Sequence, residues 1–275
     1  MKTILVPTDL SPMTDNALSV AVGLARTYQS EIILLHSAIH PMPMVAFDDE
    51  LPNTTQSTVA IFNDMERDAR EILDRFANNP AYAGVTIRPM LLTNGEGLVE
   101  AVTERPADLI VMASKGSSGL TEWLIGSNAE IIVRHAHCPV LIIKHPVANF
   151  EPEKVICAID VDERLKAPHV YPFQANGQLP NQFLYVMTPT DNRDPDGVRE
   201  WFADFAAQQG ITNAELTIRA DANVPEGIAN HADNVQADLV VVYTHGHTGL
   251  YHLFTGSVAE DVLNHANVPV LIMRA

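Results

Sequence analysis

The chain of 275 residues contains a long internal repeat. Residues 107–142 align without a gap to residues 237–272, and 17 of the 36 aligned positions are identical. The identities include Pro139-Val140-Leu141-Ile142, which recurs as Pro269-Val270-Leu271-Ile272. A period of 130 residues is too long for a solenoid of small units and indicates two copies of a whole domain. Each copied segment contains an apolar run, a glycine-containing loop, a helical stretch and a second apolar run.

Length and charge narrow the class of protein. The 275 residues accommodate two domains of about 130–145 residues, each large enough for its own core. We expect one domain at 1–145, a Pro-containing linker at 146–153 and a second domain at 154–275. The formal net charge of -17 disfavours nucleic acid and anionic membrane as partners, because both attract clusters of Lys and Arg. We therefore expect neither as a partner.

Cysteine content and hydropathy indicate the compartment. The chain has two cysteines, Cys138 and Cys157, which do not form a disulfide framework and favour a reducing compartment. The apolar run at the N-terminus is too short for a signal peptide, and the longest runs are strand-sized rather than membrane-spanning. We expect a soluble, cytoplasmic protein.

The apolar pattern predicts an α/β fold. The expected strands are 3–6, 31–37, 85–92, 108–113 and 140–144 in the first half, and 154–159, 183–187, 216–220, 238–243 and 270–273 in the second. Amphipathic helices are expected between them, and Ser11-Pro12 is a good start for the first one. The strands are too apolar to be half exposed, so we expect parallel sheets with helices on both faces.

The second copy departs from the first directly after its first strand. Asp160 corresponds to Asp9, but the following stretch has no apolar stripe and contains Pro168, Pro172 and Pro180. Because proline disrupts a helix interior, the first helix of the second domain is expected to be short, irregular or missing.

The glycine-containing loop of the first copy is a candidate anion site. In doubly wound sheets, ligands bind outside the carboxyl ends of the strands, where Asp9 and the loop 114–125 would meet. Gly116 would let the backbone approach an anion, and Gly126-Ser127 would open a helix that favours a phosphate, with Ser127 as N-cap. Asp9 would accept from a ribose hydroxyl or help to hold a divalent metal. Alternatively, these glycines only make a turn and a helix start, since shared ancestry preserves both kinds of residue.

Other chemistry has little support in the sequence. The chain has no G-x-G-x-x-G after its first strand, no G-x-x-x-x-G-K-[ST] and no G-x-S-x-G. Lys115 is either a phosphate contact or a solvated loop lysine. His245, His247 and His252 suggest a metal site, but no cysteine or further close ligand accompanies them, and we expect none.

Several of these motifs together resemble the universal stress protein family. They are Ile4-Leu5-Val6-Pro7-Thr8-Asp9, Leu34-Leu35-His36-Ser37, the loop 114–120, Gly126-Ser127 and Cys138-Pro139-Val140-Leu141-Ile142, with counterparts at 244–250, 256–257 and 268–272. The chain is similar to a tandem member of that family. The resemblance implies two Rossmann-like (adenine nucleotide alpha hydrolase-like) domains, each a five-stranded parallel sheet of order 3-2-1-4-5. It also implies that the two domains pair through their last strands.

The resemblance also implies a nucleotide site in the first domain. ATP-binding members carry G-x2-G-x9-G-[S/T], and here Ala113 replaces the first glycine while Gly116 and Gly126-Ser127 match the rest. By this resemblance the adenosine end is lined by Pro7, Thr8, Asp9 and Ser37, and the phosphate end by Lys115, Gly116, Gly126, Ser127 and Asn128. The ligand would be ATP or AMP, with or without Mg²⁺.

The corresponding site in the second domain is degenerate by the same comparison. Its members would be Asp160, Tyr243, His245, Gly246, Gly256 and Ser257. Tyr243 stands at the first glycine of the pattern, where a ring replaces backbone beside the nucleotide. We therefore expect the second domain to have lost ATP binding or to have changed its ligand.

Three functions remain open at this point. The first is a stress-response protein in which ATP or AMP serves as a signal or structural ligand, so that the protein acts as a regulator or protective factor. The second is a ligand-independent scaffold for an unknown protein partner, and the third is a slow ATP hydrolase. The sequence shows no general base, arginine finger or nucleophile pair, so no catalytic residue is assigned. A homodimer of such chains would be a four-domain assembly.

Overall fold

The computed structural model describes residues 1–38, 52–114, 126–147, 149–174, 180–244 and 258–274, with the backbone alone at 52–59, 244 and 258–260. The first half comprises β1 (Thr3–Pro7), α1 (Thr14–Tyr28), β2 (Glu31–Ser37), α2 (Pro52–Ala77), η1 (Pro80–Tyr82), β3 (Ile87–Leu92), α3 (Leu98–Glu104), β4 (Leu109–Ala113), α4 (Ser127–His135) and β5 (Val140–Ile143). The second half comprises β6 (Val155–Ala158), η2 (Glu163–Lys166), β7 (Gln182–Met187), α5 (Pro195–Gln208), β8 (Glu215–Ala220), α6 (Val224–Val235), β9 (Leu239–Thr244), α8 (Val258–His265) and β10 (Val270–Arg274).

The strands form one sheet that runs through both halves. Its order is β3-β2-β1-β4-β5-β10-β9-β6-β7-β8. Neighbouring strands within each half are parallel, whereas β5 and β10 pair antiparallel with Leu271 opposite Leu141. The expected α/β class is confirmed, and the last strands of the two halves join the halves in the way that the resemblance implied.

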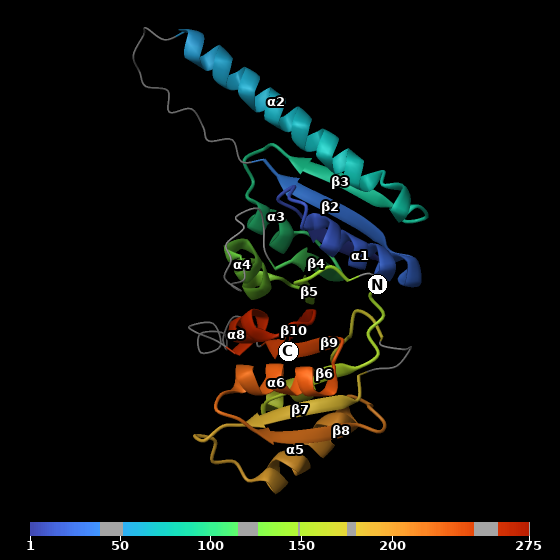
Figure 1. Cartoon of the computed structure of the whole chain (residues 1–275), viewed down its shortest axis with the longest axis vertical. Helices are drawn as coiled ribbons and strands as arrows, with labels where there is room; N and C mark the ends of the chain where they lie inside the picture. The colour runs from blue at the N-terminus through green and yellow to red at the C-terminus, as the bar shows by residue number, and fades with distance from the viewer. Residues whose placement is uncertain (39–51, 115–125, 148, 175–179, 245–257, 275) are drawn as a thin grey trace.

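Helices cover both faces of this sheet, with one apolar core on each face (Figure 1). Buried residues of α1, α2 and α5 belong to one core, and those of α3, α4, α6 and α8 belong to the other. Leu141 and Leu271 of the central strand pair enter the first core, while Val140 and Val270 enter the second. Alternation along the strands thus supplies both cores from the same short apolar segments.

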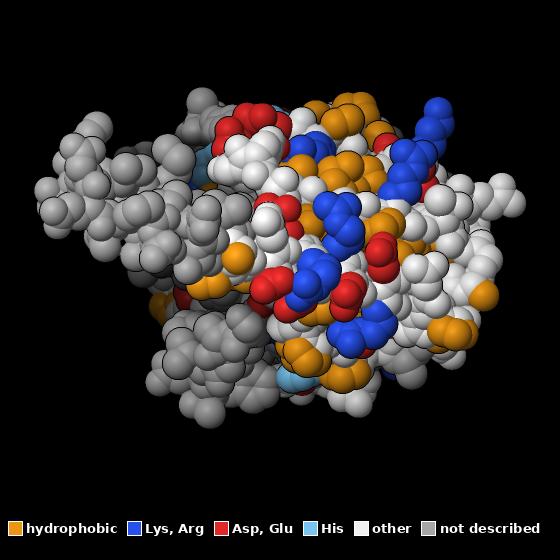
Figure 2. All heavy atoms as spheres, turned by 90° about the horizontal axis from the view of Figure 1, so that it is seen from above, with side chains coloured by type: hydrophobic (Ala, Val, Ile, Leu, Met, Phe, Trp, Pro, Cys, Tyr) orange, Lys and Arg blue, Asp and Glu red, His pale blue; other side chains and the backbone are white. Residues whose placement is uncertain are grey.

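Helix α2 extends well beyond the sheet that it covers. Ala69, Leu73 and Phe76 in its C-terminal part are buried, whereas Met65 is 56% exposed. Figure 1 shows the N-terminal part of α2 reaching past the end of the strands. Figure 2, which looks onto this end of the molecule, shows Lys and Arg interspersed with Asp and Glu; on α2 itself, Arg67 pairs with Asp64 at 2.8 Å.

The connection between β6 and β7 confirms that the first helix of the second half is shortened. Among the described residues of this connection, the 3-10 turn η2 is the only helical element, and the Asp162 side chain caps it by accepting from the Arg164 N–H at 2.9 Å. Leu165 and Phe173 from this connection are buried in the core that α1 supplies in the first half. The Tyr28 hydroxyl accepts from the Gln174 N–H at 2.7 Å and so ties the connection to the first half. Within the part described, no helix is both long and apolar enough to cross a membrane.

Candidate functional site

A cavity of about 250 Å³ lies at the carboxyl ends of β1 and β4 in the first half. Seven of the residues expected at the nucleotide site line it, namely Pro7, Thr8, Asp9, Ala113, Gly126, Ser127 and Asn128. Lys115 and Gly116 lie outside the described residues. Ser114, the first residue of the loop expected at this crevice, also lines it. The structure adds wall residues to which the sequence did not point, namely Ser11, Thr14, Leu98, Met112 and Ala129.

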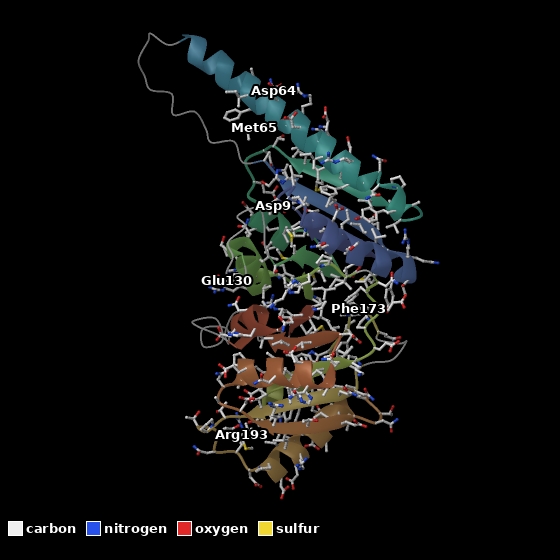
Figure 3. The ribbon with its side chains drawn as sticks, viewed as in Figure 1. Asp9, Asp64, Met65, Glu130, Phe173 and Arg193 are labelled. Carbon is white, nitrogen blue, oxygen red and sulfur yellow. The ribbon has the colours of Figure 1, made fainter. Side chains whose placement is uncertain are left out.

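A tight turn after β1 positions Asp9 at this cavity. The hydroxyls of Thr8 and Thr14 hydrogen-bond to each other at 2.5 Å, and the Thr8 hydroxyl also accepts from the Leu10 N–H at 2.8 Å. Leu10 has a φ of 65°, a left-handed conformation that reverses the chain. Asp9 Oδ1 accepts from the Ser11 N–H at 3.0 Å. Asp9, which Figure 3 labels in the first half, is therefore held in a defined orientation at the cavity.

Ser11 carries a buried hydroxyl that has no hydrogen-bond partner among the described residues. Its side chain is 7% exposed, and it lines the cavity. The expectation that Ser11 caps the first helix is wrong, because α1 begins at Thr14 and its N-cap is Met13. Leaving a buried hydroxyl unpaired costs about 1–3 kcal/mol, and a bound polar ligand would remove that cost. The lack of a partner is a three-dimensional property, so no sequence signal could have identified it.

The N-terminus of α4 forms the opposite wall of the cavity. Gly126 is its N-cap, and the Gly126 N–H donates to the Ser114 carbonyl at 2.9 Å. Ser127 is therefore the first helical residue rather than the N-cap that we expected. No side chain caps this terminus in the part of the chain described, so the N–H groups of Ser127, Asn128 and Ala129 face the cavity without an intrahelical acceptor. Such a terminus favours an anion.

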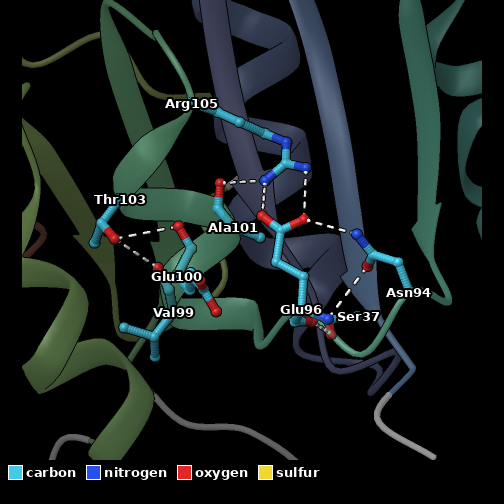
Figure 4. A network of polar contacts seen from close by, with 8 residues as sticks. All are labelled: Ser37, Asn94, Glu96, Val99, Glu100, Ala101, Thr103 and Arg105. Carbon is cyan, nitrogen blue, oxygen red and sulfur yellow. Dashed lines mark hydrogen bonds and ion pairs between the residues drawn. The ribbon is translucent and has the colours of Figure 1, made fainter.

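Ser37 does not line the cavity, although the resemblance placed it at the adenosine end. Its hydroxyl donates to the Glu96 carbonyl in the network of Figure 4. Two Arg105 N–H groups donate to the Glu96 carboxylate at 2.5 and 3.1 Å, and these hydrogen bonds lower the pKa of Glu96. The network fixes the chain just before α3, whose first residue, Leu98, reaches the cavity. Ser37 therefore contacts the segment that precedes α3 and does not itself line the cavity.

The second half has a larger cavity, of about 610 Å³, at the ends of β6, β7 and β9. Asp160 and Tyr243 line it, as expected for the degenerate site, whereas His245, Gly246, Gly256 and Ser257 lie outside the described residues. Arg193, which Figure 3 labels in the second half, lies at this cavity and had no place in the sequence motifs.

The Tyr243 side chain belongs to the core to which α1 contributes in the first half, on the face of the sheet where the second half has only the short turn η2 among its described residues between β6 and β7. The side chain is 7% exposed, and its hydroxyl hydrogen-bonds to the Tyr171 hydroxyl. Its ring lies 5.0 Å from that of His169. Burial raises the pKa of the neighbouring Cys157 to about 12, so that this thiol stays protonated beside the two tyrosines. Tyr243 therefore fills space that α1 occupies in the first half, while it still contributes to the cavity wall.

The described residues contain no group of three His, Cys, Asp or Glu side chains placed to hold a metal ion. His245 and His247 of the earlier metal hypothesis lie outside those residues. A divalent ion at the first-half cavity would have Asp9 as its carboxylate ligand, together with oxygen atoms of a bound phosphate.

The sheet, the cavity at its strand ends and the helix N-terminus in the cavity wall define a doubly wound α/β protein, the architecture in which ligands bind outside the carboxyl ends of the strands. Residues 1–144 and 156–274 each match the Universal stress protein family, and the chain belongs to this family as a tandem member.

Individual relatives cover one half of the chain. Universal stress protein MJ0531 of Methanocaldococcus jannaschii is 31% identical over 147 residues, which are 53% of this chain and 83% of that protein. Universal stress protein YxiE of Bacillus subtilis is 30% identical over 145 residues, 51% of this chain and 97% of that protein. The crystal structure of a universal stress protein from Archaeoglobus fulgidus matches the fold over 99% of this chain and 96% of its own, with a TM-score of 0.66 and 20% identity.

Proposed function

We propose that the first half binds an adenine nucleotide, ATP or AMP, in the cavity beside Asp9. The observation that carries this proposal is the Ser11 hydroxyl, which has no hydrogen-bond partner among the described residues. It lies in the same cavity as the N-terminus of α4, where the described part of the chain provides no side-chain cap. One wall thus offers a buried polar atom that a ligand would satisfy, and the other wall favours negative charge.

Different wall residues would bind the phosphate end and the adenosine end of the nucleotide. The N–H groups of Ser127, Asn128 and Ala129 would hold a phosphate, and the Asp9 carboxylate would accept from a ribose hydroxyl or hold Mg²⁺. A Cβ at Gly126 would lie 3.5 Å from the Ser114 carbonyl, so glycine leaves the approach to the helix N-terminus open. Lys115 and Gly116 remain proposed phosphate contacts.

The bound nucleotide would act as a signal or structural ligand of a stress-response protein that works as a regulator or protective factor. The protein would be cytoplasmic and would form a homodimer of four domains. The second half would have lost ATP binding or changed its ligand, since Tyr243 replaces the first glycine of the pattern.

The test begins with the small molecules that the purified chain retains. Mass spectrometry of the supernatant after denaturation should find ATP or AMP, and calorimetry with added ATP should give one site per chain. Gly126→Val should abolish this binding, whereas Gly256→Val should leave it unchanged. No retained nucleotide together with no calorimetric binding would favour the scaffold function instead. ATP turnover that Asp9→Ala abolishes while binding persists would establish the hydrolase.

A further inference from the structure

The cavity of the second half differs in character from that of the first. Its volume of about 610 Å³ lies within the range of small-molecule sites, about 300–1,000 Å³. About half of the described residues that line it are aliphatic, and they include Leu165, Val186, Val224, Ile228 and Val242. A cleft of this size with a few polar groups beside an apolar surface is typical of small-molecule sites.

The register of the strands shows which residues occupy equivalent positions at the two cavities. Pro7 pairs with Leu35 in the first half, and Ala158 pairs with Leu184 in the second. Val186 therefore holds the strand position that Ser37 holds in the first half, two residues further along. A Cβ at Gly227 would lie 2.5 Å from Val186 Cγ1, so this glycine lets α6 pack directly against that valine.

A hydrogen-bonded turn places polar groups at one end of the cavity. The Asp191 N–H donates to the Thr188 carbonyl at 3.0 Å, and the Arg193 N–H donates to Asp191 Oδ1 at 3.0 Å. The Tyr185 hydroxyl donates to the Asp191 carboxylate and accepts from Arg193 Nη1, the latter at 3.1 Å. These contacts orient the guanidinium at the rim of the cavity, where the Arg193 side chain is 46% exposed.

Hydrogen bonds and burial determine the protonation states of Asp191 and Tyr185 in this turn. Burial raises the pKa of Asp191, but hydrogen bonds from Tyr185 and Arg193 outweigh it, and the net pKa lies below its ordinary value. Burial and the neighbouring Asp191 raise the pKa of Tyr185 to about 12. At neutral pH the turn therefore carries an ionised Asp191 and an un-ionised Tyr185.

The charged side chains at this cavity disfavour the binding of a polyanion. Arg193 Nη1 lies 3.6 Å from both Asp160 Oδ1 and Asp191 Oδ1. Among the described wall residues, two carboxylates therefore face one guanidinium, and a phosphate chain would meet net repulsion. An ammonium group could reach these carboxylates only in competition with Arg193, which already lies 3.6 Å from both. A hydroxyl group suits both neighbours, because it donates to the Asp160 carboxylate and accepts from the guanidinium.

We propose that the second half binds an uncharged, largely apolar compound that carries a hydroxyl group, a class to which phenols and aromatic alcohols belong. Its apolar part lies on Val224 and Ile228, and its hydroxyl lies between Asp160 and Arg193. The site is separate from the nucleotide site of the first half and uses none of its residues.

Calorimetry on the full chain at pH 7 tests the charge preference with three ligands of matched size: 2-naphthol, 2-naphthoate and 2-naphthylmethylamine. The neutral 2-naphthol should bind one site per chain, about tenfold or more tighter than the anion or the cation. The absence of saturable binding of 2-naphthol, or equal or tighter binding of either charged compound, would overturn the proposal.

Two matched variants locate the site. Val224 is the first residue of α6, and Leu98 is the first residue of α3; each lines the cavity of its own half. Val224→Phe should weaken 2-naphthol binding about tenfold or more, whereas Leu98→Phe should leave it unchanged. Loss in the Leu98 variant alone would place the ligand in the first half and overturn the assignment.

A surface variant keeps the test valid if Val224→Phe fails to fold. The Asp160 side chain is 64% exposed, so Asp160→Asn should fold normally. Removing its charge should weaken 2-naphthol binding and strengthen 2-naphthoate binding, each by about threefold or more. Unchanged binding of both compounds would contradict the placement of the hydroxyl between Asp160 and Arg193.

Discussion

Asp108 and Asp238 make the same contact in the two halves of the chain. Asp108 Oδ2 accepts from the backbone N–H groups of Lys2 and Thr3, at 2.5 and 2.9 Å. Asp238 Oδ2 accepts from the N–H groups of residues 153 and 154, at 3.0 and 2.9 Å. Each carboxylate thus secures the start of the first strand of its half. The presence of aspartate at both equivalent positions of the repeat therefore has a structural reason, and it is not evidence of a binding site.

Replacing Asp108 should reduce stability at neutral pH but not in acid. Hydrogen bonds from the Lys2 and Thr3 backbone lower the pKa of Asp108. Because the folded pKa lies below the unfolded value, about 3.9, the stabilisation is present above that value and is lost as the pH falls through the folded pKa. Asp108→Asn should destabilise by about 1 kcal/mol at pH 7, since the group is exposed. Urea unfolding at pH 7 and in strong acid measures this; a difference independent of pH would contradict it.

Ser11→Ala should stabilise the empty protein and weaken nucleotide binding. Removing a buried hydroxyl without a partner should raise the free energy of unfolding by about 1 kcal/mol. ATP affinity should fall about tenfold, which corresponds to about 1.4 kcal/mol. The control is Ser19→Ala, because the Ser19 hydroxyl already donates to the Asn16 carbonyl at 3.0 Å. Similar ATP affinities in both variants would argue against a ligand contact at Ser11.

Ser37→Ala and Arg105→Ala should weaken ATP binding by similar, small factors of about threefold. Both changes loosen the Glu96 segment that precedes α3, and neither removes a wall residue. The measurement is ATP calorimetry on the two variants and their double mutant, in which the effects should not add. A loss in Ser37→Ala without one in Arg105→Ala would indicate that Ser37 contacts the base directly.

Gly227→Ala and Gly23→Ala should change stability in opposite directions. Both glycines lie within helices, but a Cβ at Gly227 would lie 2.5 Å from Val186 Cγ1, whereas a Cβ at Gly23 meets nothing within 4 Å. Gly227→Ala should destabilise by about 1–3 kcal/mol through overpacking. Gly23→Ala should stabilise by about 0.5–1 kcal/mol through helix propensity. Thermal unfolding measures both; a stabilised Gly227→Ala would show that α6 can shift away from β7.

The fold could be predicted from the sequence because local patterns determine it. Apolar runs located the strands of both halves, and the prolines after Asp160 predicted the missing helix. The sequence patterns did not locate the ends of helix α6, although a signal for its start was present. Asn223 caps it by accepting from the Glu226 N–H at 2.9 Å, and Pro225 stands in its first turn.

The candidate site could be predicted only where its residues belong to a continuous motif. Asp9 and Gly126 follow from motifs, and the structure brings them to one cavity. Identifying Ser11 requires knowing that its buried hydroxyl has no hydrogen-bond partner among the described residues. Identifying Arg193 requires the turn at Asp191, which lies outside the motifs. Tyr243 was predicted to make the second site degenerate, but its hydrogen bond to Tyr171 depends on the fold of the connection between β6 and β7, which the motif does not specify.

The antiparallel junction of β5 with β10 has a consequence for assembly. Each half already uses its final strand to join the other, and β3 and β8 are the outermost strands of the described sheet. The backbone hydrogen bonds of the junction are therefore satisfied inside a single chain. Two chains that associate must therefore do so through helices, loops or those outermost strands, and not through β5 or β10.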